Sequence, residues 1–406
     1  MLVWEAQRCF ALAKPRAGVA SEFSDEKIRL VAHTIFVSHG ILLYGRLSAA
    51  GSSTREASHM YTTIIRPILF ALSKDDAEKA HELAVRAIQC LQHAPPLLYL
   101  IALWYRANHN PKPYQIWGMT FPNRVGLAAG LDKHGKMMLF MQALGFGFLT
   151  IGSVLPEFQA GRDRPRLFRL EEHQALINRM GFNSLGVDEV AENMAAVRSR
   201  MKVPVFASLG MMKERLLEEA HKDYCDVLAE LWEFADGFTI NVSSPNTPDL
   251  RKLQGREYIE TLVKAVVAER NKHLKDSGGR AFKPVLVKLA PDLDEEQIMI
   301  TLEGLAAGCA DGVIMGNTTL TRPGCTHGTP HANEQGGFSG GKLFFKTMEK
   351  VKIIKRHAPK LPLVMAGAVS RPERARMAFD AGVDMVKVHT PLIYQGPSLI
   401  TRLRNA

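Results

Sequence analysis

Four small polar side chains crowd into one short segment in the middle of the chain, TINVSSPNTPDL at residues 239–250. Asn241, Ser243, Ser244 and Asn246 follow directly on an apolar, β-branched run. Such a run predicts a buried strand, so these groups are expected at the tip of that strand. Asparagine offers both hydrogen-bond donors and an acceptor, which makes this strand tip a candidate binding or catalytic site.

Polar side chains or glycines also end or line the other apolar runs: Asp132 with Lys133, Ser153, Ser208, Lys288, Asn317 with Thr318 and Thr319, Gly367, and His389 with Thr390. Each group alone has a structural explanation. A strand-end Ser or Asn commonly caps the next helix, and a lone Lys near a strand commonly extends its amine to solvent. Capping and solvent exposure do not readily explain polar residues after nearly every predicted strand. Their repetition indicates that the strand ends form one functional face of the protein.

Eight apolar runs predict strands: 124–130, 148–154, 203–210, 237–244, 284–291, 312–317, 362–369 and 385–390. Nearly all are continuously apolar, which is typical of parallel strands covered on both faces. Helical stretches such as 255–274 and 294–307 separate them. This alternation predicts a TIM (β/α)8 barrel, whose active site lies at the carboxyl ends of the strands. A doubly wound sheet is the alternative, although no strand is followed by G-x-G-x-x-G.

Four asparagines match a planar ligand with alternating N–H and C=O edges, such as a pyrimidine: Asn178, Asn241, Asn246 and Asn317. Lys133 could bind a carboxylate, and Lys288 could stabilise negative charge on a cofactor. The turns GGFSGG (336–341) and MAGAV (365–369) offer backbone N–H groups of the kind that hold a phosphate.

Two further motifs are weaker. GGFSGGK nearly matches a P-loop, but Leu343 stands where Ser or Thr is required and no strand directly precedes it. Cys325, His327 and His331 cluster in CTHGTPH, but their spacing fits no standard zinc site. We therefore predict no metal site, and we interpret the second segment as a solvated or substrate-covering loop.

Composition places the chain among globular proteins with a large core. Its 406 residues are 46% hydrophobic and 23% charged, and the formal net charge is +10. The charge favours an anionic substrate or membrane surface. The basic residues are scattered, so no nucleic-acid partner is predicted. Five separated cysteines without a C-x-x-C pair fit a reducing compartment.

The first 110 residues differ from the rest. Residues 1–59 predict an extension whose order the sequence leaves open, and the apolar stretch 30–45 is too short for a confident membrane span. Residues 60–110 predict a helical hairpin, with Ser73 as the N-cap of its second helix. Residues 95–108 carry too many apolar groups for one buried face, so they either pack on a core or meet a membrane or an apolar ligand.

Residues 60–406 resemble class 2 dihydroorotate dehydrogenase, the quinone-linked, FMN-containing enzyme of pyrimidine synthesis. The motifs that carry the resemblance are, in order, GLAAGLDKHG, PRLFRLEEHQALINRMGFNS, NVSSPNTPDLRKLQ, VKLAPDL, NTT, GGFSGG and LIYQGP. The helical hairpin before the barrel and Ser244 are characteristic of class 2, because class 1 enzymes have a cysteine at this base position and lack the hairpin.

The resemblance implies a role for each matching residue. Ser244 would remove the proton from C5 of (S)-dihydroorotate, and a hydride would pass from C6 to FMN, giving orotate. Substrate binding would fall to Lys133, Asn178, Arg179, Met180, Gly181, Phe182, Asn241, Asn246, Asn317 and Thr318. FMN binding would fall to Ala129, Gly130, Leu131, Asp132, Lys133, Ser153, Ser208, Asn241, Lys288, Gly316, Gly340, Gly367, Ala368, His389 and Thr390. His81 and Arg169 would line a quinone tunnel.

Several positions depart from the family pattern on the expected FMN side: Ser208, Met211, Met212, Gly316, Met365, Ala368 and His389. The family usually has Thr in place of Gly316 and a glycine in place of Ala368. A backbone contact to phosphate survives the second change if φ is negative. We expect a working enzyme that retains FMN less tightly. The alternative is a degenerate or altered flavin barrel that binds a pyrimidine ligand with weak or no turnover.

The resemblance also implies a place in the cell. A quinone acceptor predicts a peripheral membrane protein that is bound through the hairpin. Since the sequence shows no convincing transit peptide or span, we expect the cytoplasmic side of a bacterial cell membrane, and we expect a monomer. The mitochondrial inner membrane is the alternative.

Overall fold

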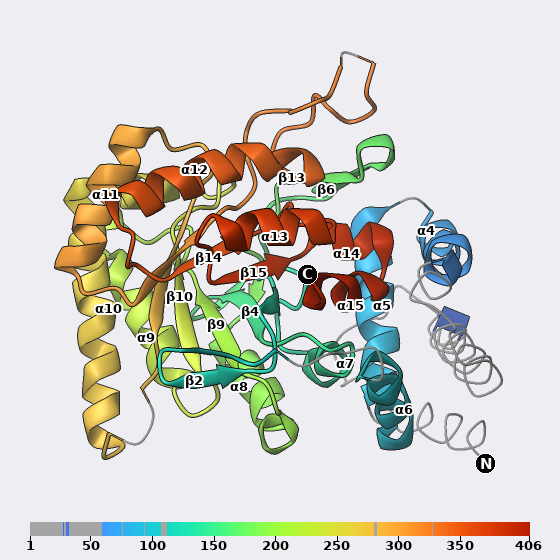
Figure 1. Cartoon of the computed structure of the whole chain (residues 1–406), viewed down its shortest axis with the longest axis horizontal. Helices are drawn as coiled ribbons and strands as arrows, with labels where there is room; N and C mark the ends of the chain where they lie inside the picture. The colour runs from blue at the N-terminus through green and yellow to red at the C-terminus, as the bar shows by residue number, and fades with distance from the viewer. Residues whose placement is uncertain are drawn as a thin grey trace.

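The computed structural model describes residues 59–74, 76–92, 94–106, 112–279, 282–326 and 328–406, together with Lys27, Leu30 and Val31. The predicted extension at 1–59 therefore lies almost wholly outside the described residues. Figure 1 shows a barrel with a group of helices, α4 to α6, packed against one side. We call these three helices the appendage.

Eight parallel strands form the barrel, in the order β3-β15-β14-β12-β11-β10-β9-β4. Their bounds are β3 Val125–Leu127, β4 Leu149–Val154, β9 Val205–Leu209, β10 Gly237–Asn241, β11 Val285–Leu289, β12 Gly312–Met315, β14 Leu363–Ala366 and β15 Met385–Val388. A parallel bridge between Gly126 and Phe148 joins the two end strands and brings the sheet round on itself. The predicted strands and barrel are thus confirmed, and the doubly wound sheet is wrong.

Helices surround the sheet, as continuous apolar strands require. They are α7 Met138–Ala143, α8 Val187–Ala195, α9 Ala220–Glu230, α10 Arg256–Asp276, α11 Glu295–Ala307, α12 Phe344–His357, α13 Pro372–Asp380, α14 Thr390–Gln395 and α15 Ser398–Arg404. Short 3-10 helices lie at Glu171–His173, Arg198–Arg200, Leu217–Glu219, Leu250–Gln254 and Gly341–Leu343. A capping box starts α11, where Asp294 and Gln297 satisfy each other's backbone N–H groups.

Aromatic side chains seal the amino-terminal end of the barrel. The antiparallel hairpin of β1 (Tyr114–Ile116) and β2 (Met119–Phe121) lies across this end. Phe121 packs edge-on against Phe148 at 5.6 Å between ring centroids, and Trp117 packs against Phe206 at 6.2 Å. We call these four rings the aromatic floor. Because the floor is packed, ligands reach the barrel interior from the carboxyl ends of the strands.

Two small antiparallel sheets extend the loops at the carboxyl-terminal end. One contains β6 Leu167–Leu170, β7 Ala175–Asn178 and β13 Gly337–Gly340, and the other pairs β5 Phe158–Gln159 with β8 Ser184–Leu185. The prediction of a phosphate-binding turn over residues 336–341 was thus partly wrong. Phe338 N–H already donates to Thr319 O at 2.7 Å, so the turn begins only at Gly340. Strand β13 lies inside the GGFSGGK segment, where a P-loop would have a loop, so the rejection of the P-loop agrees with the structure.

The appendage consists of a π-helical turn at Tyr61–Ile65, α4 Arg66–Leu72, α5 Ala77–Gln92 and α6 Pro95–Arg106. The helices were predicted, but the cap was wrong. Ser73 ends α4, and Asp76 instead accepts the N–H groups of Glu78 and Lys79 at the start of α5. The sequence SKDDAE offered both a serine and an acid as caps, and only the short turn after α4 decides between them.

Helix α6 divides its apolar residues between the core and solvent. Ile101 and Trp104 are buried, whereas Tyr99 is 61% exposed and Leu103 is 39% exposed. Packing on the core is therefore confirmed for one face of this helix, whereas contact of its other face with a membrane or an apolar ligand stays a prediction. Among the described residues, no helix is both long enough and apolar enough to cross a membrane.

Candidate active site

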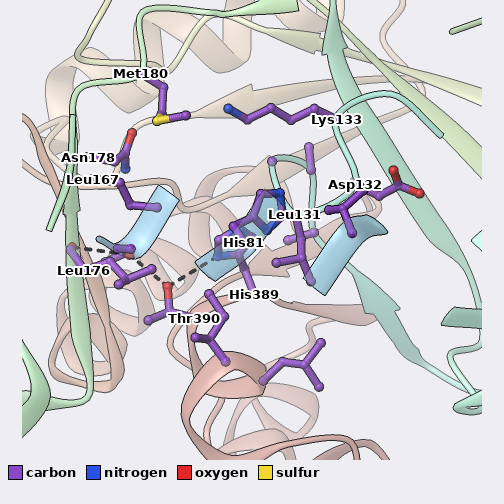
Figure 2. Close-up of a pocket in the computed structure, with 18 of the residues that line it drawn as sticks. His81, Leu131, Asp132, Lys133, Leu167, Leu176, Asn178, Met180, His389 and Thr390 are labelled. Carbon is purple, nitrogen blue, oxygen red and sulfur yellow. Dashed lines mark hydrogen bonds between the residues drawn. The ribbon is translucent and has the colours of Figure 1, made fainter. Parts of the chain in front are cut away.

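A cavity of about 620 Å³ runs from the appendage helices α4 and α5 to the carboxyl ends of the barrel strands. Twenty-four of the residues proposed from the sequence line it: His81, Ala129, Gly130, Leu131, Asp132, Lys133, Ser153, Arg169, Asn178, Met180, Gly181, Phe182, Asn241, Ser244, Asn246, Lys288, Gly316, Asn317, Thr318, Gly340, Gly367, Ala368, His389 and Thr390. Figure 2 shows part of this cavity, with Lys133 and Met180 pointing toward each other across it. One continuous space therefore connects the predicted substrate, flavin and quinone regions.

The segment 239–250 is held in shape by its own amides. Asn241 Nδ2 donates to Ser153 Oγ at 2.7 Å, and Asn241 Oδ1 accepts from Ser243 Oγ at 3.0 Å. Ser243 Oγ also accepts from Asn317 Nδ2 at 2.8 Å. Ser243 is thus fully engaged between two asparagines, and it joins the loops after β10 and β12.

Ser244 lies on the other side of the same turn and faces the cavity. Its hydroxyl oxygen accepts the N–H of Asn246 at 3.3 Å, and Asn246 Nδ2 donates to Asn178 Oδ1 at 3.1 Å. The side chain is 8% exposed, whereas Ser243 is fully buried. Of the two serines, Ser244 is therefore the one whose hydroxyl can meet a ligand.

An arginine fastens this turn to the next loop. Arg251 Nε donates to Ser243 O at 3.1 Å and its Nη2 donates to Thr318 O at 2.9 Å, while Asp292 pairs with Nη1 at 2.9 Å. Arg251 was missed, although it lies within the quoted motif NVSSPNTPDLRKLQ. Its contacts depend on loops that are far apart in sequence, so spacing alone carried no signal.

Lys133 lines the cavity, and burial lowers its pKa to about 7. Its Nζ donates to Asn183 Oδ1 at 2.5 Å. Asn183 was missed, although it directly follows the predicted loop 178–182. Asp132 lines the cavity but turns its carboxylate toward the N–H groups of Lys136 and Met137, at 2.8 and 2.9 Å. Figure 2 shows this carboxylate directed away from the cavity centre, so it orders the turn.

Lys288 lies deeper in the barrel, beside Asn241 in the register of β10 and β11. It is 7% exposed, and burial alone lowers its pKa to about 8. The amine is therefore mostly protonated at neutral pH. A cation next to a cavity, with no carboxylate contributing to its titration, is suited to a ligand that carries negative charge.

The cavity reaches a turn between β14 and α13, where Gly367 and Ala368 line it. Ser339 Oγ and Thr390 Oγ1 lie 2.8 Å apart beside it. Gly367 has φ of 84°, and no atom lies within 4 Å of where its Cβ would stand. Ala368 has φ of 62°. The condition of a negative φ at Ala368 is therefore not met, and this alanine holds a left-handed conformation that glycine adopts more easily.

Gly316 is required by the backbone. Its φ is 115°, and an added Cβ would lie 2.3 Å from Ala366 O. We expect Gly316→Ala to lower the free energy of unfolding by about 2–4 kcal/mol, because both φ strain and a backbone clash oppose it. Thr, the residue usual in the family, should cost at least as much. Gly367→Ala is the matched control, since it adds φ strain without a clash and should cost only about 1–2 kcal/mol. Equal losses in chemical denaturation would contradict this explanation.

Some predicted positions lie away from the cavity. Arg179 turns its guanidinium to Glu334, at 2.6 Å. Ser208 lies behind the wall and contacts Ser153 Oγ at 3.0 Å. The family departures at Met211, Met212 and Met365 do not line the cavity. Met365 belongs to the core because it alternates with the inward-facing Val364 and Ala366 along β14.

The CTHGTPH loop is only partly described, because His327 lies outside the described residues. The His331 ring packs against Phe168 at 5.4 Å between centroids, and Thr329 Oγ1 lies 3.3 Å from His173 Nε2. Among the described residues, no three His, Cys, Asp or Glu side chains gather as a metal site.

Comparisons with known proteins agree with this geometry. The family model for dihydroorotate dehydrogenase matches residues 113–406. The chain belongs to the dihydroorotate dehydrogenase family. It is 41% identical over 343 residues to a Salinispora arenicola protein named dihydroorotate dehydrogenase (quinone), covering 84% of this chain and 97% of the relative. A Vibrio parahaemolyticus protein of the same name is 39% identical over 326 residues, covering 80% of this chain and 94% of the relative.

Solved structures of this family have the same fold. DHODH from Eimeria tenella in complex with ferulenol has a TM-score of 0.70 at 28% identity, covering 83% of this chain and 93% of that chain. The ligand-free form has a TM-score of 0.67 at 30% identity, covering 77% and 93%. The named relatives and the family model confirm the quinone-linked family identified from the motifs.

Proposed function

We propose that this chain oxidises dihydroorotate to orotate through bound FMN and passes the electrons to a membrane quinone. Dehydrogenation of dihydroorotate in pyrimidine biosynthesis is the activity of the family to which the chain belongs. The observation that carries the proposal is the convergence of Ser244, Lys133, Lys288 and four asparagines on one cavity at the carboxyl ends of the strands.

The substrate would lie beneath the loop after β7. Lys133 would meet its carboxylate, and Asn178, Asn241, Asn246 and Asn317 would match its ring edges. Ser244 would take the proton from carbon. Because a serine hydroxyl is a weak base, it must pass its own proton on as it acts. Its hydrogen-bond contact with Asn246 N–H would help hold the oxygen in place.

The cavity also fits FMN. The family is generally flavin-dependent, and the space beside Gly367 would admit a phosphate to the backbone N–H groups of the turn. Lys288 would place a positive charge where negative charge builds up on the ring system. When bound, the flavin supplies the acceptor for two electrons from the substrate. The left-handed Ala368 supports the expectation of weaker FMN retention, because the turn is less easily adopted.

The appendage would form the route for the second substrate. His81 and Arg169 line the cavity between α5 and β6, and the Arg169 guanidinium lies 4.0 Å from the centroid of the Phe70 ring. Burial lowers the pKa of His81 to about 3, so this ring is neutral at physiological pH. An apolar passage with a neutral imidazole and the N–H donors of the Arg169 guanidinium suits a quinone, whose carbonyl oxygens accept hydrogen bonds. We propose that residues 60–110 dock on a membrane surface and that residues 111–406 form the catalytic barrel, acting as a monomer on a bacterial cell membrane.

The decisive experiment follows the flavin colour. Purified full-length chain, reconstituted with FMN under anaerobic conditions, should lose its visible flavin absorbance when dihydroorotate is added and regain it when a soluble quinone is added. Dihydrouracil, which lacks the carboxylate, is the control and should bleach the flavin far less. Flavin that remains coloured with dihydroorotate would instead favour a barrel that binds a pyrimidine without turnover.

A further inference from the structure

A buried ion pair joins the appendage to the barrel. Glu78, in the first turn of α5, is 6% exposed, and Arg166, just before β6, is 7% exposed. Arg166 Nε lies 3.1 and 3.0 Å from the two carboxylate oxygens of Glu78, and its Nη2 lies 2.8 Å from Oε1. Such a pair fixes the orientation of α5 and its distance from β6, because two N–H groups of one guanidinium donate to the same carboxylate.

The same guanidinium also shapes the chain in front of β6. Arg166 Nη1 donates to Ala160 O and to Arg162 O, both at 2.7 Å. Arg166 therefore ties the turn at residues 160–166 to α5. We call this turn the bracing turn.

The bracing turn also contacts the loop that begins at Met180 and lines the cavity. Arg162 N–H donates to Met180 O at 3.1 Å, and Arg179 N–H donates to Arg166 O at 2.8 Å. The two segments are in close contact, since a Cβ on Gly161 would lie 2.3 Å from Met180 O. Met180 and the three residues that follow it line the cavity. A chain of direct contacts therefore runs from α5 to the proposed substrate loop.

The charge of Glu78 also acts on Lys133, which contacts the other end of this loop. Lys133 bonds Asn183 at the end of this loop. After burial, which lowers the pKa of Lys133, the largest influence on that pKa is the negative charge of Glu78, which raises it. The charged and titratable groups around Lys133 are Glu78, His81 and Glu82 on α5, His134 in its own loop, Arg164 and Arg166 in the bracing turn, and His389 after β15.

We propose that Glu78 and Arg166 are positioning residues through which appendage helix α5 shapes the dihydroorotate-binding loop. The appendage then serves both ends of the reaction: it provides the route for the acceptor, and it also holds the loop over the donor substrate. This inference rests on the proposed function, and it adds that substrate affinity depends on a helix outside the barrel.

The test uses Glu78→Gln in the FMN-loaded full chain, with Arg164→Gln as the matched control. Arg164 belongs to the same bracing turn and pairs with Glu82 on the same helix. It also lies 3.4 Å from Glu78 Oε1, but its side chain is 41% exposed, so water screens both contacts. Anaerobic bleaching at varied dihydroorotate gives the dissociation constant and the maximal rate separately. We expect Glu78→Gln to weaken binding at least about tenfold, since one partner of a buried pair is lost. Arg164→Gln should change binding less than about twofold.

Two further readouts separate positioning from general damage. The maximal bleaching rate and the rate of flavin reoxidation by a soluble quinone should stay within about threefold of the unmodified chain. Glu78 itself lines the cavity, but Ser244, His81 and Arg169 are all retained. Orotate affinity should fall as pH rises through about 7, where Lys133 loses its proton. In Glu78→Gln this fall should begin at lower pH, because the charge that supports protonated Lys133 is gone. Glu78→Asp, which keeps the charge, should keep the original pH profile.

The outcomes are distinguishable. If the unmodified chain is not bleached by dihydroorotate, the proposed function fails. If the unmodified chain is bleached but Glu78→Gln binds dihydroorotate as tightly as Arg164→Gln does, the positioning role is overturned. Should Glu78→Gln not fold, as judged by thermal unfolding and flavin content, Arg166→Lys replaces it. This variant keeps the charge but loses the two-pronged contact, and unchanged dihydroorotate affinity in it would equally overturn the inference.

Discussion

Ser244→Ala should lower the rate of flavin bleaching by dihydroorotate about 10²–10⁴-fold near neutral pH, the usual contribution of a positioned base. The hydroxyl faces the cavity, and its contact with Asn246 N–H holds the oxygen in place. Flavin content should be unchanged, because the alanine is smaller and Ser244 is not among the predicted flavin contacts. Stopped-flow absorbance under anaerobic conditions gives the bleaching rate, and the visible spectrum gives the flavin content.

Raising the pH provides a second check on Ser244. A substrate proton that is lost to hydroxide needs no protein base, so the defect of Ser244→Ala should shrink as pH rises. Ser243→Ala is the paired variant. Ser243 is buried between Asn241 and Asn317, so its loss should reduce stability and should slow bleaching far less. Turnover that is undiminished in Ser244→Ala would remove this residue from the role of base.

Lys288→Met should slow bleaching about 10²–10³-fold, the range seen when one preorganised electrostatic contact is removed. The lysine is mostly protonated at pH 7, since its pKa is about 8. Methionine keeps the length and removes the charge. The midpoint reduction potential of the bound flavin should fall, because the negative charge that arises on reduction loses its cation. Spectroelectrochemistry on the flavin-loaded chain measures this potential without any substrate.

The barrel contains a matched control for that variant. Lys387 is also inward-facing and is 2% exposed, but it does not line the cavity. Its Nζ finds no hydrogen-bond partner in the described part of the chain and lies 5.6 and 5.5 Å from the ring centroids of Phe148 and Phe206. Burial keeps its pKa well below the usual value. Lys387→Met should leave the bleaching rate near normal and raise stability by about 1–2 kcal/mol, since an unpaired amine is no longer buried. A potential shift as large as that of Lys288→Met would argue against a local role for Lys288.

Much of the barrel could be predicted because its signals are local. Every continuous apolar run became a strand of the main sheet, since parallel strands need apolar residues on both faces. The short strands β6, β7 and β13 gave no such signal. Gly337–Gly340 is nearly all small residues, and it forms a strand because Ala175–Asn178 lies beside it. That pairing is a tertiary effect, which no window of the sequence contains.

The cavity could be predicted where residues follow a strand, but not where they reach it from elsewhere. Ser244 and Lys288 were identified from their places on predicted strands. Asn183, Arg251 and Glu78 were missed, because each acts through a partner that is distant along the chain. The left-handed conformation of Ala368 was also hidden, since only the backbone reveals the sign of φ. The three missed residues depend on contacts across the fold, whereas the Ala368 conformation depends on a backbone angle that the sequence does not specify.

The aromatic floor has a practical consequence for engineering this chain. Trp117, Phe121, Phe148 and Phe206 pack at the end of the barrel opposite the cavity. Redesign of that end can therefore raise heat resistance while the reactive end keeps its shape, because none of the four rings lines the cavity. For the same reason, loss of a floor ring should make the protein scarce in the cell without making each surviving molecule slower. A substitution in the aromatic floor would therefore lower the amount of folded protein, whereas a substitution at Ser244 would lower the rate of each molecule.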